Sequence, residues 1–119
     1  MTTFKLAVAT NGKDGLKDVV STVFGRAKTF TVMDVHDNEV SNVKVLENSA
    51  SEYHHGAGPI AVKMLIDEGV NVVLANKLGF GASELLKQHN ITLVLTKPGL
   101  IVEDVAKNSI LERSQQNGT

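Results

Sequence analysis

Short apolar runs alternate with glycine- or proline-containing turns along the whole chain. Three early runs have strand character, and two later ones have the near-continuous apolar composition of strands buried on both faces. We expect five strands, at residues 4–9, 28–35, 39–46, 70–75 and 91–95. The turn His36-Asp37-Asn38 joins the second and third runs and predicts an antiparallel hairpin. Its second strand alternates polar and apolar side chains, as an edge strand does.

Helical spacing of apolar residues follows three of the later turns. We expect three helices, beginning near residues 59, 80 and 100. The first has Pro59 at its first helical position and Gly69 just beyond its end, and the second ends near His89 with Asn90 as its cap. Residues 13–27 are irregular apart from one short turn.

The order of these elements, β-β-β-α-β-α-β-α, requires right-handed parallel crossovers in its second half. We therefore predict one three-layer α/β domain over residues 1–112, followed by a flexible polar tail over residues 113–119. Its five-stranded mixed sheet has the order 3-2-1-4-5 with strand 2 antiparallel, which is the ribonuclease H-like arrangement. The loops after strands one, three, four and five then open at one edge, where open α/β folds bind ligands.

The composition of the chain excludes several classes of partner and of metal site. The net charge of −1 comes from interspersed charges, so neither nucleic acid nor an anionic membrane is an expected partner. No leader or membrane-spanning run is evident, and we expect a cytoplasmic protein. The chain has no cysteine, which excludes thiolate-held zinc and iron–sulfur sites. The central strands at residues 4–9 and 70–75 have no carboxylate, so the magnesium chemistry of nucleases and ATPases is not expected.

Two glycine-rich helix starts lie on the converging loops. A helix N-terminus offers unpaired N–H groups and a positive dipole end, which favour an anion. Neither start matches a phosphate loop or a dinucleotide-binding motif, and helix-start geometry alone is an alternative explanation. The candidate cofactor-binding residues are His54, His55, Gly56, Ala57, Gly58, Gly79, Phe80, Gly81, Ala82, Arg26 and Asn11.

His54 and His55 are the candidate metal ligands, because imidazole binds iron, copper, zinc and nickel. Two ligands are too few for a closed metal site, and local packing of both rings is the alternative. Arg26 can donate a forked pair of hydrogen bonds to an oxyanion or a sulfide-rich ligand, and it can equally be an ordinary surface charge.

The sequence resembles the dinitrogenase iron–molybdenum cofactor biosynthesis family, whose members include small NifX-like accessory or carrier domains. The resemblance extends over residues 4–110 and rests on six segments: residues 5–9, Phe24-Gly25-Arg26-Ala27 with Phe30, His55-Gly56-Ala57-Gly58, Gly69-Val70, Gly79-Phe80-Gly81-Ala82 and Gly99. It implies a ribonuclease H-like fold and a carrier or scaffold for iron–sulfur or molybdenum-containing clusters. Phe80 stands where the family commonly has proline, which changes the wall of the pocket.

From the residues and the resemblance together, we expect a non-enzymatic carrier. It would hold a preassembled anionic metal–sulfur cluster, or an oxyanion, without covalent bonds, and cluster-assembly or acceptor metalloproteins would be its partners. Two alternatives stay open. One is an enzyme that acts on a small phosphorylated or carboxylated metabolite and uses the two histidines as general base. The other is an interaction domain that docks onto a metalloprotein.

Overall fold

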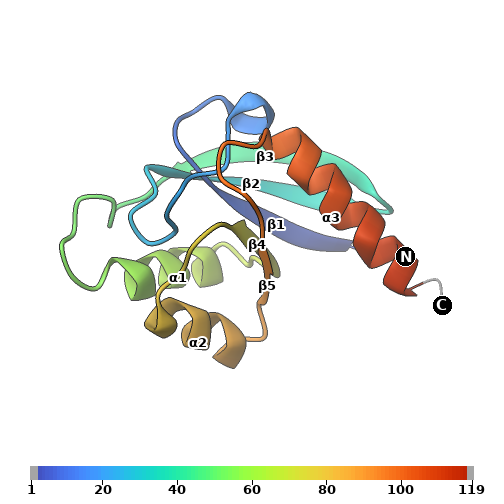
Figure 1. The fold of residues 1–119 in the computed structure, drawn as a ribbon. Coiled ribbons are helices and arrows are strands. Elements are labelled where there is room, and N and C mark those ends of the chain that lie inside the picture. The colour runs from blue at the N-terminus through green and yellow to red at the C-terminus, as the bar shows by residue number, and fades with distance from the viewer. Residues whose placement is uncertain (1–2, 118–119) are drawn as a thin grey trace.

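One mixed sheet with helices on both faces forms the fold of the computed structural model (Figure 1). The structure describes the backbone of residues 3–117 and the side chains of residues 3–110. Its elements are β1 (Thr3–Thr10), the 3-10 helix η1 (Gly15–Lys17), β2 (Thr29–His36), β3 (Glu39–Glu47), α1 (Ala57–Asp67), β4 (Val72–Ala75), α2 (Phe80–Gln88), β5 (Thr92–Leu95) and α3 (Val102–Asn117).

The sheet order is β3-β2-β1-β4-β5, as predicted. β2 runs antiparallel to both of its neighbours, whereas β1, β4 and β5 are parallel to one another. This is the expected five-stranded mixed sheet, and the ribonuclease H-like label for it stays a prediction.

Helices α1 and α2 cover one face of the sheet and α3 covers the other, which gives the three layers (Figure 1). Phe30, Leu65 and Leu86 are fully buried in the core on the side of α1 and α2. Leu6 and Met33 are fully buried on the side of α3. Successive strand residues point to opposite faces, so each inner strand contributes to both cores. Within the described residues, no helix has the length and apolar character needed to cross a membrane.

Helices α1 and α2 end where the sequence predicts, and both ends have the same backbone geometry. Gly69 has a φ of +78° and donates its N–H to the carbonyl of Ile66 at 3.0 Å, while Val70 donates to Leu65 at 3.1 Å. This pair of bonds is the Schellman motif, which satisfies carbonyls that the helix leaves free. Asn90, with a φ of +60°, closes α2 in the same way.

The structure corrects the start of the first helix. α1 begins at Ala57, with Gly56 as its N-cap at a φ of +76°, so Pro59 is the third helical residue and not the first. Proline fits there because the N–H groups of a first turn have no partner inside the helix. At the other end of the chain, the backbone of α3 continues to Asn117, and the flexibility of residues 113–119 stays a prediction.

The edge strand β3 is not regular along its length. Its register against β2 shifts between Val32, which pairs with Lys44, and Asp34, which pairs with Ser41. Asn42 lies in this interval with a φ of +51°. Two residues of β3 therefore oppose one residue of β2, which is a β-bulge.

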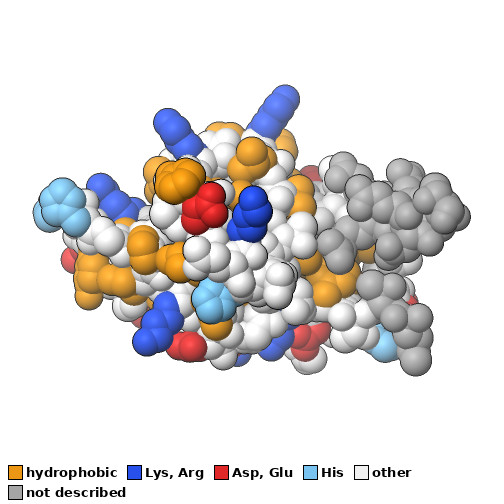
Figure 2. All heavy atoms as spheres, turned by 90° about the horizontal axis from the view of Figure 1, so that it is seen from below, with side chains coloured by type: hydrophobic (Ala, Val, Ile, Leu, Met, Phe, Trp, Pro, Cys, Tyr) orange, Lys and Arg blue, Asp and Glu red, His pale blue; other side chains and the backbone are white. Residues whose placement is uncertain are grey.

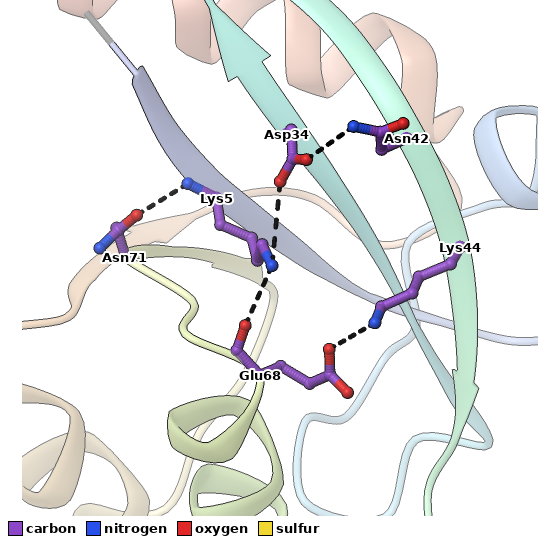
Figure 3. Close-up of polar contacts among 6 residues, drawn as sticks. All are labelled: Lys5, Asp34, Asn42, Lys44, Glu68 and Asn71. Atoms are coloured by element: carbon purple, nitrogen blue, oxygen red, sulfur yellow. Dashed lines mark hydrogen bonds and ion pairs between the residues drawn. The ribbon is translucent and has the colours of Figure 1, made fainter.

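A polar network joins three strands to the end of α1, on the edge of the sheet opposite the converging loops (Figure 3). Lys5 Nζ donates to the carbonyl of Glu68 at 3.2 Å and lies 3.9 Å from Asp34 Oδ1. Asn42 Nδ2 donates to Asp34 Oδ2 at 3.0 Å, and Lys44 Nζ lies 2.6 Å from Glu68 Oε2. These contacts hold the carboxyl end of α1 against the sheet.

The two helix ends give a paired stability prediction. Gly69→Ala should lower the free energy of unfolding by about 1 kcal/mol, because a side chain is unfavourable at a positive φ. Asn90→Gly should leave it unchanged or raise it, because glycine removes the same unfavourable contact. Urea unfolding followed by circular dichroism measures both, and a Gly69→Ala variant as stable as the wild type would contradict the prediction.

Candidate functional site

The carboxyl ends of β1, β3, β4 and β5 lie at one edge of the sheet, and the loops that follow them lie along the left and the top of Figure 1. This confirms the predicted convergence. The two larger hollows described among these loops are a first cavity of about 640 Å³ and a second cavity of about 340 Å³, and a smaller one of about 170 Å³ lies between the loop after β5 and α3. Ser51 lines both the first and the second cavity, so these two adjoin.

The first cavity lies between the segment before β2, the first turn of α1 and the connection from β4 into α2. Its lining includes six of the candidate binding residues: Arg26, Ala57, Gly58, Gly79, Gly81 and Ala82. Gly56 and Phe80 do not line it, although each directly precedes a residue that does. Both predicted helix starts thus contribute to one cavity.

Two cations line the first cavity. Arg26 and Lys77 have no hydrogen bond or ion pair with any other described residue. Among the described residues the lining contains no carboxylate, and most of its other side chains are apolar. Both cations are exposed. Two cations without a carboxylate beside them favour an anionic ligand, since hydrogen bonds between charged groups are stronger than those between neutral groups.

Sequence reasoning missed Lys77. A signal for it was present, because Lys77 follows the buried strand β4 and precedes the glycine at the start of α2. A basic residue in that position lies at the carboxyl end of a central strand, where ligands of open α/β folds bind.

The glycines of this region fall into two groups. A Cβ atom on Gly25 would lie 2.7 Å from the backbone nitrogen of Gly58 and 2.8 Å from its Cα, so the two backbones are in direct contact. A Cβ on Gly58 would lie 3.1 Å from the Cβ of Ala82. By contrast, a Cβ on Gly79 or Gly81 would meet nothing within 4 Å. The first group packs the loops together, and the second borders open space at the first cavity.

The candidate metal ligands His54 and His55 are exposed and line neither cavity. The described residues contain no group of three or more histidine, cysteine, aspartate or glutamate side chains arranged to hold a metal ion. Metal binding by the two histidines therefore stays a prediction. His36 lies at the opposite edge of the sheet, where its Nδ1 is 2.6 Å from Thr3 Oγ1.

All the side chains that line the second cavity are polar or charged, apart from the glycine at position 12. Asn11, a candidate binding residue, lines this cavity and not the first one. Lys13 Nζ lies 2.5 Å from Glu47 Oε1 at its border. The hydrogen bond from Lys13 and its positive charge lower the pKa of the Glu47 carboxyl below the ordinary value. Lys28 also lines the cavity, and its ammonium has no partner among the described residues, although its carbonyl accepts the N–H of Asn48 at 3.1 Å.

Exposed apolar side chains concentrate at this same edge. The structure describes seven large hydrophobic residues that are exposed, and all but Val43 lie on the converging loops or where they meet the sheet and α2. The six are Val23, Tyr53, Phe80, Leu95, Leu100 and Ile101. Phe80 is 81% exposed. Figure 2, seen from the side of α1 and α2, shows hydrophobic side chains gathered towards its left, where the loops lie.

Residues 4–111 match the protein family described as dinitrogenase iron-molybdenum cofactor. The matched range includes both glycine-rich helix starts and every residue that lines the first cavity. The match therefore includes the candidate site as well as the scaffold.

Solved structures share the fold. The apo form of the orange protein (ORP) from Desulfovibrio gigas has a TM-score of 0.82 at 27% identity, covering 92% of this chain and 88% of that one. A Thermotoga protein of the DUF35 family, named as a candidate NifB protein, has a TM-score of 0.71 at 33% identity, with the same coverage of 92% and 88%.

A relative in sequence is an uncharacterized protein of Methanocaldococcus jannaschii, 29% identical over 68 residues. The match covers 57% of this chain and 58% of that protein, so this chain spans less than two thirds of that relative's length.

Substitution by alanine should change the free energy of unfolding in opposite directions in the two groups of glycines. Gly25→Ala should lower the free energy of unfolding by about 2 kcal/mol, because its Cβ overlaps backbone atoms that cannot rotate away. Gly81→Ala should leave it unchanged or raise it by up to about 1 kcal/mol, because glycine is a poor helix former. Thermal and urea unfolding test both, and equal stabilities of the two variants would contradict this division.

Proposed function

The chain belongs to the dinitrogenase iron-molybdenum cofactor family, and we propose that it is a carrier that binds an anionic metal–sulfur cluster, or a precursor of one, in the first cavity. One observation carries the proposal: within the part of the chain that the structure describes, Arg26 and Lys77 are unpaired cations in a cavity whose lining has no carboxylate. Family membership supports a role in cofactor assembly, and the likeness to a protein solved in an apo form supports a bound cargo.

The residues present fit such a cargo. The cavity of about 640 Å³ has room for a small cluster, and the open backbone at Gly79 and Gly81 allows it to approach closely. The guanidinium of Arg26 and the ammonium of Lys77 would donate to bridging sulfides or terminal oxygens. Because the chain has no cysteine, the protein would hold the cargo by charge and hydrogen bonds. Such contacts break more readily than covalent metal–thiolate bonds, so the protein could release the cargo to an acceptor.

The lining favours a carrier over the enzyme alternative. That alternative needs a general base within hydrogen-bonding reach of the substrate. The described lining of the first cavity contains no histidine, carboxylate or cysteine, and its one hydroxyl belongs to Ser51. The side chains that line the first cavity can bind and orient a ligand.

The exposed apolar residues around the cavity support a protein partner. Contiguous exposed apolar surface commonly marks a site of protein association. A cluster-assembly or acceptor metalloprotein that docked against Phe80 and Val23 would lie directly at the mouth of the first cavity. Cargo would then pass between proteins without crossing open solvent.

The cations give a direct test with tetrathiomolybdate, a stable molybdenum–sulfur dianion. Arg26→Gln and Lys77→Gln should each weaken its binding about tenfold, because each removes one charge-assisted hydrogen bond. Lys63→Gln is the matched control, since Lys63 is an exposed residue of α1 outside both cavities. Anaerobic titration calorimetry measures the affinities. If all three variants bind equally, or the wild type does not bind, the proposed site is wrong.

The histidines require a separate measurement. Replacing both His54 and His55 by alanine should reduce the iron or molybdenum that remains bound after anaerobic purification. The two residues directly precede the first turn of α1, which lines the first cavity, and their imidazole nitrogens would bind a metal of the cluster from outside that lining. The same variant should keep its affinity for tetrathiomolybdate, because neither ring lines the first cavity. His89→Ala is the control. Unchanged metal and acid-labile sulfide in the double variant would exclude these histidines as ligands.

A further inference from the structure

We propose that the second cavity is a distinct binding site for a small, multiply charged oxyanion of the sulfate, phosphate or molybdate class. The site is formed by the loop after β1, the start of β2 and the end of β3 with its following loop. It uses none of the cations of the first cavity and stands independently of the carrier role.

The free polar groups of the second cavity are donors. The Lys28 ammonium, the Asn11 side-chain amide and the Ser51 hydroxyl all line it, and none has a side-chain partner among the described residues. An ammonium, an amide and a hydroxyl can donate together to the several oxygens of one oxyanion. The volume of about 340 Å³ leaves room for such an anion and ordered water.

The floor of the cavity is preformed. Asn48 is only 4% exposed, and its Nδ2 donates to the carbonyls of Gly25 at 2.9 Å and Ala27 at 2.8 Å. Its Oδ1 accepts the N–H of Ala50 at 3.0 Å. These bonds hold the wall segments in place, so an anion would enter without first ordering them. A site that needs little ordering loses little affinity to conformational entropy.

The charge balance of the cavity also favours an anion. Its one lining carboxylate, Glu47, is paired with Lys13 at 2.5 Å, which leaves the charge of Lys28 uncompensated. The nearby carboxylate of Asp18 is not in the lining and already accepts two backbone N–H groups. An incoming dianion would compete with Glu47 for Lys13, so Glu47 should limit the affinity of the site.

This competition predicts opposite effects for two exposed residues. Lys28→Gln should weaken sulfate binding about fivefold, since it removes the free cation. Glu47→Gln should tighten it about threefold, since it releases Lys13 to the anion. Titration of the ¹⁵N-labelled protein with sodium sulfate at low ionic strength measures both. Saturable amide shifts are expected at Asn11 and Lys28, which line the second cavity and not the first.

The controls separate this site from the first cavity. Lys63→Gln makes the same change of charge elsewhere and should leave sulfate binding as in the wild type. Arg26→Gln should weaken tetrathiomolybdate binding and leave the sulfate shifts of the second cavity unchanged. Thermal unfolding confirms that each variant is folded.

Three outcomes would overturn the proposal. The first is the absence of saturable shifts in the second cavity. The second is shifts confined to the residues around Arg26 and Lys77. The third is a Glu47→Gln variant that binds sulfate no more tightly than the wild type. None of them contradicts the binding of tetrathiomolybdate in the first cavity, so the two proposals can fail separately.

Discussion

The loop edge of this protein depends on the contact between the backbones of Gly25 and Gly58. No side chain fits between them, so the segment before β2 lies directly on the first turn of α1. Gly58 in turn lies against Ala82, which brings the start of α2 into the same contact. Arg26 follows Gly25 in the chain, so this contact also determines where its guanidinium meets the first cavity. The positions of the residues that line the first cavity therefore depend on this close packing of backbones.

The fold was predictable because it follows from local patterns and one rule of handedness. Apolar runs marked the strands, and right-handed crossovers left the order β3-β2-β1-β4-β5. The helix ends were predictable for a similar reason. Gly69 and Asn90 adopt a positive φ that few other residues tolerate, so their place in the sequence indicates the end of a helix. Local signals of this kind do not depend on the rest of the chain.

The site was less predictable, because the lining of a cavity depends on contacts between distant segments. The sequence indicated that the two glycine-rich segments would converge, and it put Lys77 in one of the converging loops without marking it as a binding residue. It offered Arg26 as a binding residue without placing it among those loops. The sequence also did not indicate that Asn11 lines a second cavity, apart from the other candidate residues. His54 and His55 were predicted as metal ligands because imidazole binds transition metals, yet both residues lie outside the two cavities. Side-chain direction in a loop is set by its tertiary neighbours, which a single sequence does not display.

Both lateral edges of the sheet are open, and an open edge is a template on which another strand can add. β3 interrupts that template with the bulge at Asn42 and carries the charge of Lys44 beside it. β5 offers only four residues. Growth of the sheet into ordered aggregates is therefore disfavoured on both sides.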